Sequence, residues 1–203
     1  MKHTAAGAAA VIGVGALALF GAGGASADPG SVTFNDGGTQ FTRTVSNVTP
    51  AVGDTITVDT AFYRLQAGDQ TYWWFKDYHP DCLTYVPGTA KLTDAAGAHQ
   101  SEPYLEIKPT FIAADFVAAG LQVVGKVGPG NTAPVFSAQY KVGACATGTS
   151  LTTGMGYNTN MGGINAQLST KGPSITVGGT PGGGADSGSS SLTSLLGGLG
   201  SSK

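Results

Sequence analysis

Asp77, His79 and Asp81 lie within five residues of one another and have side chains that can move protons or bind metals. Histidine and carboxylates are the usual general acid–base groups of enzymes. Pro80, between His79 and Asp81, favours a turn at the end of a strand, and no G-x-S-x-G or H-E-x-x-H motif occurs in the chain. We therefore predict that the protein is not an enzyme and has no catalytic residues. A hydrolase that uses these three side chains is the third alternative.

Metal and cofactor motifs are also lacking. The Asp-x-Asp-x-Asp-Gly spacing of a calcium loop is absent, so Asp77–Asp81 and Asp94–Gly97 are better explained as turns. The glycines of Gly154–Gly156 and Gly178–Gly179 lack the strand-to-helix setting and the lysine of a phosphate loop. We predict no metal site and no cofactor.

An aromatic run, from Tyr72 to Tyr78, is the stronger candidate for binding. In a strand, successive side chains point to opposite faces. Trp73 and Phe75 then share one face, and the other carries Tyr72, Trp74, Lys76 and Tyr78. Because Lys76 prefers water, we expect Trp73 and Phe75 in the core, and Tyr72, Trp74 and Tyr78 as an exposed row. Such a row could stack on sugar rings or anchor a protein partner. Alternatively, a loop or the Gly97–Gly120 segment covers it.

The elements that must position these residues read as strands. Through the middle of the chain apolar residues recur with a period of two, and Gly, Pro, Asn and Asp interrupt the pattern at short intervals. Thr55–Arg64 is the clearest strand, and Ile112–Ala119 is at best a short helical connector. The further predicted strands are Gln40–Ser46, Thr71–Tyr78, Leu83–Val86, Ala90–Thr93, Tyr104–Ile107, Leu121–Val127, Val135–Val142, Leu151–Tyr157 and Ser174–Val177. These candidates predict an all-β antiparallel sandwich of about seven to nine strands.

The two ends of the chain differ from the middle. Lys2 and His3, an apolar run and Ala25-Ser26-Ala27 predict a secretory signal peptide over residues 1–27, cleaved before Asp28. Residues 28–177 form the predicted domain. Residues 178–203 are rich in Gly and Ser and predict a disordered tail. The leucines between Leu192 and Leu199 could dock on a partner or on the cell envelope, or the tail could be inert.

Export and composition narrow the possible partners. Cys82 and Cys145 are the only cysteines, and an exported chain meets oxidising conditions, so we predict a disulfide between them; two buried free thiols are the alternative. Charged residues make up 11% of the chain and the formal net charge is -2. Nucleic-acid surfaces need clustered Lys and Arg, so we predict no nucleic-acid partner. After signal cleavage we expect no integral membrane segment.

Two segments carry a family resemblance. Pro50-Ala51-Val52-Gly53-Asp54-Thr55-Ile56-Thr57-Val58 and Asp81-Cys82-Leu83-Thr84-Tyr85-Val86-Pro87-Gly88-Thr89-Ala90 resemble the bacterial surface repeat domains of the DUF11 type. The resemblance covers roughly residues 41–93. It implies an immunoglobulin-like sandwich from secreted or wall-associated proteins that are structural or adhesive and not catalytic. The aromatic run replaces the family's usual Asn-rich middle. The Gly- and Ala-rich, Lys-poor composition is similar to small exported proteins of actinobacteria.

The sequence therefore predicts a secreted or cell-wall-associated, non-enzymatic structural, adhesive or binding protein. The alternative is a carbohydrate-recognition module that uses Tyr72, Trp74 and Tyr78. A polysaccharide or protein of the cell envelope is the expected kind of partner.

Overall fold

The computed structural model describes residues 28–94, 97–100, 104–128, 131–163 and 165–178. Their secondary structure consists of 15 strands. The predicted signal peptide (1–27) and, apart from Gly178, the predicted tail lie outside the described residues. The strands are β1 (Gly30–Asp36), β2 (Thr39–Val45), β3 (Thr55–Arg64), β4 (Gln70–Tyr78), β5 (Leu83–Tyr85), β6 (Lys91–Asp94), β7 (Gly97–Gln100), β8 (Leu105–Lys108), β9 (Phe111–Asp115), β10 (Val123–Gly125), β11 (Val135–Val142), β12 (Ser150–Thr152), β13 (Gly154–Thr159), β14 (Ala166–Leu168) and β15 (Ser174–Thr176).

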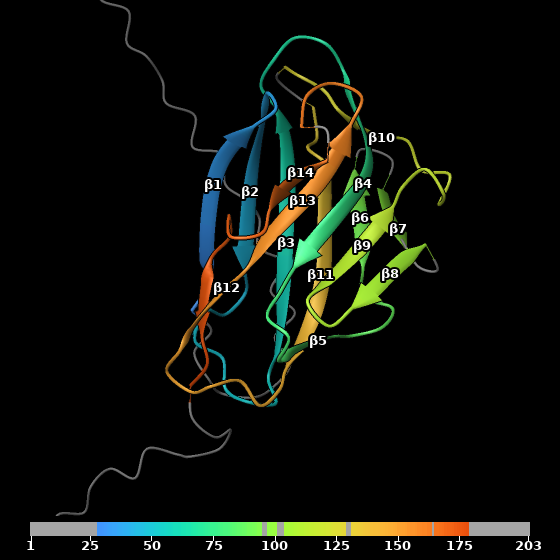
Figure 1. Cartoon of the computed structure of the whole chain (residues 1–203). Helices are drawn as coiled ribbons and strands as arrows, with labels where there is room; N and C mark the ends of the chain where they lie inside the picture. Colours follow the sequence, from blue (N-terminus) through green and yellow to red (C-terminus); the bar gives the residue numbers. More distant parts are fainter. Residues whose placement is uncertain (1–27, 95–96, 101–103, 129–130, 164, 179–203) are drawn as a thin grey trace, which may run out of the picture.

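The strands form two facing antiparallel sheets and one small sheet (Figure 1). The seven-stranded sheet has the order β1-β2-β3-β11-β6-β7, and β5 also pairs with β11. The six-stranded sheet has the order β14-β13-β4-β9-β8, and β10 also pairs with β4. Strands β12 and β15 make the two-stranded sheet. The predicted all-β antiparallel sandwich is confirmed for the described residues.

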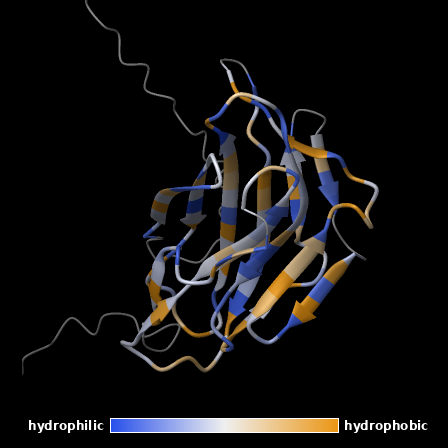
Figure 2. Ribbon diagram, turned by 45° about the horizontal axis from the view of Figure 1, so that its top comes forward, coloured by the Kyte–Doolittle hydropathy of each residue, from blue (hydrophilic) through white to orange (hydrophobic). Residues whose placement is uncertain are grey.

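One hydrophobic core fills the space between the two large sheets. Apolar and polar residues alternate along several strands (Figure 2), and β2, β3 and β11 each turn one face inward. Aromatic rings from both sheets meet at the centre: the Phe62 and Phe75 centroids are 5.2 Å apart, and those of Phe75 and Phe136 are 4.9 Å apart. All three rings are buried. Full burial of one such side chain contributes about 1.5–3 kcal/mol to stability.

The predicted strands agree with the structure best where the alternation is clean. Thr55–Arg64 and Val135–Val142 are strands with those bounds. The helical connector predicted over Ile112–Ala119 is wrong: Phe111–Asp115 is strand β9, and a turn follows it. Ile112 and Ala114 are buried and the residues beside them are not, so the period there is two. The predicted range of seven to nine strands was too low, because three edge strands were missed: the seven-residue β1 and the short strands β7 and β14.

The disulfide between Cys82 and Cys145 is confirmed. Cys82 lies just before β5, and Cys145 lies shortly after β11, the strand with which β5 pairs. The bond therefore fastens the short β5 segment to a central strand of the seven-stranded sheet. Within the part of the chain that the structure describes, no helix has the length and apolar character that a membrane crossing requires.

Candidate ligand-binding face

Strand β4 lies inside the six-stranded sheet, between β13 and β9. Its alternation is interrupted once. Asn158 of β13 pairs with Trp74, and the next residue, Thr159, pairs with Tyr72, so Trp73 is an extra residue in a β-bulge. The bulge changes which residues face the core on either side of it.

The bulge corrects the predicted faces of the aromatic run. Tyr72 is buried, with its hydroxyl 2.8 Å from Thr39 Oγ1, and burial raises its pKa to about 12. The predicted exposed row therefore loses Tyr72. Trp73, predicted in the core, has 39% of its surface exposed. Phe75 is buried, as expected.

Beyond the bulge, Trp74, Lys76 and Tyr78 alternate with buried Phe75 and Asp77 and so share the outer face of the sheet. Neither tryptophan belongs to the core cluster. The structure thus brings Trp74 and Tyr78 together as predicted, adds Trp73, and removes Tyr72.

Lys76 lies close to three aromatic rings of this outer face. Its Nζ lies 4.1 Å from the centroid of the Phe111 ring, 5.8 Å from that of Trp74 and 5.7 Å from that of Tyr78. These distances are within the range of cation–π attraction. The Tyr78 and Phe111 rings meet edge to face, with centroids 5.9 Å apart. We call Trp73, Trp74, Lys76, Tyr78 and Phe111 the aromatic face.

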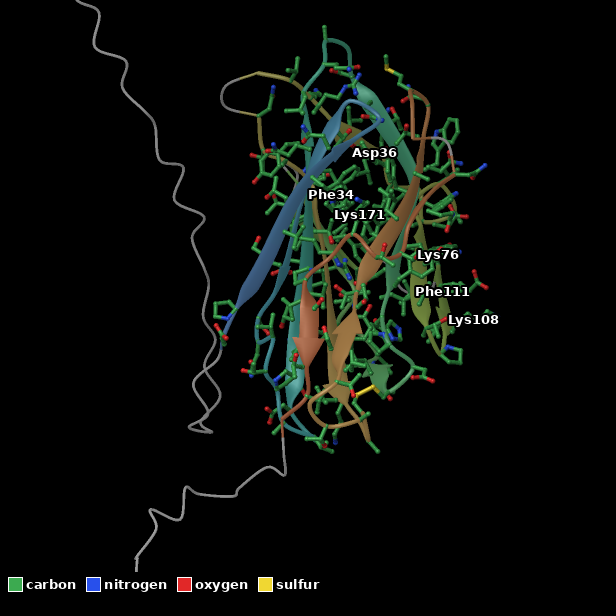
Figure 3. All side chains as sticks on the ribbon, turned by 60° about the vertical axis from the view of Figure 1, so that its left-hand side comes forward. Phe34, Asp36, Lys76, Lys108, Phe111 and Lys171 are labelled. Atoms are coloured by element: carbon green, nitrogen blue, oxygen red, sulfur yellow. A yellow bond between two sulfur atoms is a disulfide. The ribbon has the colours of Figure 1, made fainter. Side chains whose placement is uncertain are left out.

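Small residues flank the aromatic face, on which Trp74, Tyr78 and Phe111 are half-buried and Trp73 is exposed. Opposite Lys76 stand Gly156 on β13 and Ala113 on β9, neither of which can cover the rings. A Cβ atom at position 156 would lie 2.9 Å from the Ala166 carbonyl oxygen, so that position favours glycine. At the rim, the Tyr78 hydroxyl donates a hydrogen bond to Gln167 Oε1. Lys76 and Lys108 lie on the same side of the molecule as Phe111 (Figure 3).

Phe111 was missed because its strand was taken for a connector. The period of two over Phe111, Ala113 and Asp115 was the signal that could have placed it on the outer face. The chemistry of the face is that of a binding surface: flat rings, one cation and amide groups at the rim.

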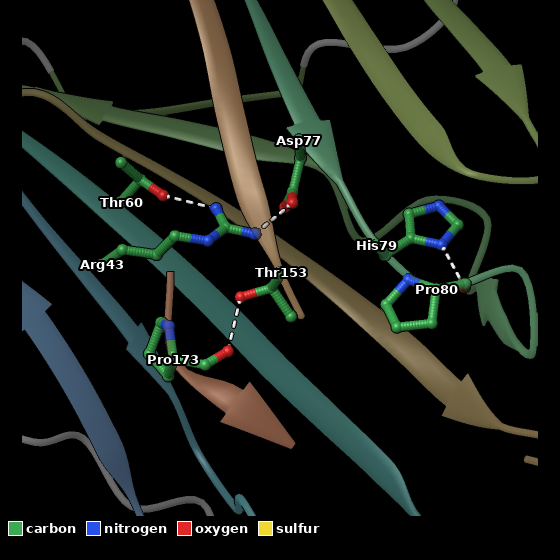
Figure 4. Close-up of polar contacts among 7 residues, drawn as sticks. All are labelled: Arg43, Thr60, Asp77, His79, Pro80, Thr153 and Pro173. Carbon is green, nitrogen blue, oxygen red and sulfur yellow. Dashed lines mark hydrogen bonds and ion pairs between the residues drawn. The ribbon is translucent and has the colours of Figure 1, made fainter. Parts of the chain in front are cut away.

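Asp77, His79 and Asp81 do not form a common site. Asp77 points into the core and forms an ion pair with Arg43, whose Nη1 also donates a hydrogen bond to Thr60 Oγ1 at 2.9 Å (Figure 4). His79 is buried, and its Nδ1 lies 2.9 Å from the Pro80 carbonyl oxygen. Burial lowers the pKa of His79, which favours a neutral ring. Asp81 is exposed in the following turn.

The inward position of Arg43, the partner of Asp77, could have been found from the sequence. Arg43 lies between Phe41 and Val45 on the inward face of β2, where a period of two places it among core residues. The pair links the two large sheets and lies on the side of the sheet opposite the aromatic face. Over the described ranges, no group of three His, Cys, Asp or Glu side chains is arranged to hold a metal ion.

Comparisons with known proteins give only distant structural likenesses. No protein-family model matches the chain, and no curated protein matches it in sequence. The T6 backbone pilin of serotype M6 Streptococcus pyogenes has a TM-score of 0.43 and 11% identity, over 74% of this chain and 35% of the pilin. A C-terminal fragment of the major pilin GBS80 of Streptococcus agalactiae has a TM-score of 0.43 and 9% identity, over 74% of this chain and 56% of the fragment.

A putative membrane anchored protein from Corynebacterium diphtheriae has a TM-score of 0.35 and 9% identity, over 70% of this chain and 45% of that protein. The chain spans less than two thirds of each of these structures.

Proposed function

We infer that the protein is an exported, non-enzymatic binding protein of the cell surface or cell wall, which engages its partner through the aromatic face. The observation that carries this inference is the outward placement of Trp73 and Trp74 beside the Lys76–Phe111 contact. Tryptophan, tyrosine and charged anchors dominate the energetics of binding surfaces. Two of the three candidate acid–base groups, Asp77 and His79, are buried in the interior, and Asp81 is exposed in the turn after them.

A carbohydrate polymer of the envelope is the ligand class that we favour. Aromatic rings on the outer face of a sheet suit stacking against sugar rings, since the apolar faces of both are then removed from water. Gln167, at the rim beside Tyr78, supplies an amide that can hydrogen-bond sugar hydroxyls. A protein partner would use the same face, so the experiment includes both.

Intrinsic fluorescence offers a direct measurement. The chain has two tryptophans, and both lie on this face, so tryptophan emission reports on it alone. Purified envelope polysaccharide should change the emission of the secreted chain in a saturable way. Trp74→Ala should weaken that binding at least tenfold, which corresponds to about 1.4 kcal/mol.

Tyr63→Ala is the matched control, because Tyr63 is 38% exposed but lies on β3 in the other sheet. It should leave the affinity within about twofold, since it does not touch the proposed face. Equal binding by the wild type, Trp74→Ala and Tyr63→Ala would exclude the aromatic face. If the wild type binds envelope proteins and no polysaccharide, and Trp74→Ala loses that binding, the ligand is a protein and the aromatic face is still the binding site.

A further inference from the structure

Strand β1 leaves one of its edges without a strand partner in the part of the chain that the structure describes. It pairs with β2 along all seven residues, from Gly30 opposite Val45 to Asp36 opposite Thr39. It is the terminal strand of the seven-stranded sheet. Figure 3 shows it on the outside of the sandwich, across the view from Lys76 and Phe111. This edge is therefore separate from the aromatic face.

The hairpin fixes which peptide groups point outward. Gly37 and Gly38 form its two-residue turn with φ values of 53° and 74°, the left-handed conformation that this turn needs. Asp36 and Thr39 then form a hydrogen-bonded pair, and hydrogen-bonded pairs alternate along the ladder. The N–H and C=O groups of Ser31, Thr33 and Asn35 consequently point away from β2. Among the described residues these groups have no backbone hydrogen-bond partner.

The edge also lacks the features that usually prevent strand pairing. Natural edge strands are short, charged, bulged or interrupted by proline. The other terminal strands follow this rule: β14 has three residues, and β8 has four, including Glu106 and Lys108. Strand β1 has seven residues, an unbroken register, and no charge or proline between Gly30 and Asn35. Such an edge is suited to accept another strand.

We propose that residues 189–196 of this same chain pair with β1 and extend the seven-stranded sheet. The chain leaves the described fold beside the start of β1. The Val48 N–H donates to the Asp28 carbonyl at 2.7 Å, and the Thr176 N–H donates to the Val48 carbonyl at 2.7 Å. Gly178, the last described residue, donates to the Pro50 carbonyl at 2.8 Å.

The length of the connection permits this pairing. Strand β1 measures roughly 23 Å at about 3.3 Å per residue. The residues between Gly178 and Ser189 can span about 33 Å when extended. A segment tethered this closely has an effective concentration in the millimolar range, which favours pairing within one chain over pairing between chains.

The chemistry of residues 189–196 matches the edge. They read Ser-Ser-Ser-Leu-Thr-Ser-Leu-Leu, without glycine, proline or charge, inside a region otherwise rich in glycine. In a strand, Leu192 and Leu196 share one face. That face can continue the apolar strip of Val32, which is 36% exposed, and Phe34, which stacks on Phe41. The pairing thus covers an exposed valine and provides hydrogen-bond partners for the outward N–H and C=O groups of Ser31, Thr33 and Asn35.

Amide hydrogen exchange on the full secreted chain, followed by NMR, tests the proposal. The amides of Ser31, Thr33 and Asn35 should exchange at least tenfold more slowly in the wild type than in a Leu192→Asp/Leu196→Asp double variant. The amides of Val32 and Phe34 point to β2 and should stay protected in both. Leu199→Asp, a tail leucine outside the segment, is the matched control and should leave all five amides protected.

A reciprocal variant tests the edge itself. Thr33→Pro removes an N–H that takes no part in the β1–β2 ladder, and should release the amides of residues 192–196 to fast exchange, whereas Thr33→Val should not. Equal exchange of Ser31, Thr33 and Asn35 in the wild type and the double variant would overturn the proposal, whether or not Thr33→Pro folds. Protection that grows with protein concentration together with a doubled mass would also overturn it, because a second copy would then be the occupant.

Discussion

At the residue scale, the Arg43–Asp77 ion pair places two charged side chains inside the hydrophobic core. Both side chains are essentially buried, and Arg43 Nε and Asp77 Oδ2 make no further hydrogen bond among the described residues. Removing two charges from water costs several kcal/mol per ion, and their attraction repays this cost only in part. The main effect of the pair is therefore to fix how the two sheets pack together, and its net contribution to stability is small.

This balance predicts a non-additive mutational pattern. Asp77→Leu should lower the free energy of unfolding by about 3–5 kcal/mol, because it leaves the Arg43 charge buried and unpaired. Arg43→Met combined with Asp77→Leu should recover most of that loss, since neither charge is then buried. Urea unfolding of the two single variants and the double variant measures the coupling. A double variant no more stable than Asp77→Leu would contradict this account.

The sequence indicates the position of each residue of this pair but not their contact. Strand parity places Arg43 among the inward residues of β2, yet nothing in the sequence names its partner on β4. Asp77 drew attention beside His79 and Asp81, although its parity with Phe75 places it on the inward face of β4. Contacts between distant strands follow from three-dimensional packing, which spacing along one strand cannot supply.

At the scale of the element, the β4 bulge creates the aromatic face. Without the extra residue at Trp73, strict alternation would turn one of the two adjacent tryptophans inward. With it, both lie outside the core, and Tyr72 and Phe75 take the inward positions on either side. A bulge leaves no mark in the hydrophobic period of a single strand, so the sequence predicted the strand and misplaced two of its side chains.

The stability of β4 variants should follow this arrangement. Phe75→Ala and Tyr72→Ala should each cost about 3–5 kcal/mol, because each removes a buried aromatic ring. Trp73→Ala should change stability by about 0.5 kcal/mol, as a partly exposed side chain outside the core does. Thermal and urea unfolding of the three variants give the comparison. A loss above about 2 kcal/mol for Trp73→Ala would place that ring back in the core.

Other elements show where sequence patterns suffice. Strands β3 and β11 were predicted with the observed bounds because each alternates over eight or more residues between clear turns. Strand β9 was misread because alanine favours helices, and tertiary pairing with β4 and β8 overrode that preference. The three-residue edge strand β14 is too short to carry a period.

At the scale of the whole molecule, the disulfide joins segments that are 63 residues apart in sequence. A loop of that size removes unfolded-state entropy equivalent to roughly 4 kcal/mol in the chain-entropy model. The bond was predicted from an even cysteine count and export, which required no knowledge of the fold.

Replacing both cysteines with alanine should therefore lower the free energy of unfolding by roughly 4 kcal/mol. Urea unfolding of Cys82→Ala/Cys145→Ala against the oxidised wild type measures the change. The reduced wild type is the control and should lose a similar amount. A variant within about 1 kcal/mol of the oxidised protein would show that the unfolded chain gains little freedom when the bond is absent.

Both ends of the described sandwich hydrogen-bond to one short loop: Asp28 bonds to Val48, and Gly178 bonds to Pro50. A pull between these ends would not run along the length of the strands. It would separate β1 from β2, or β15 from β12, by breaking their hydrogen bonds one after another. A domain that transmits tension along a fibre needs its ends at opposite poles, where many hydrogen bonds share the load in shear. The described sandwich, with Asp28 and Gly178 bonded to one loop, does not have that arrangement.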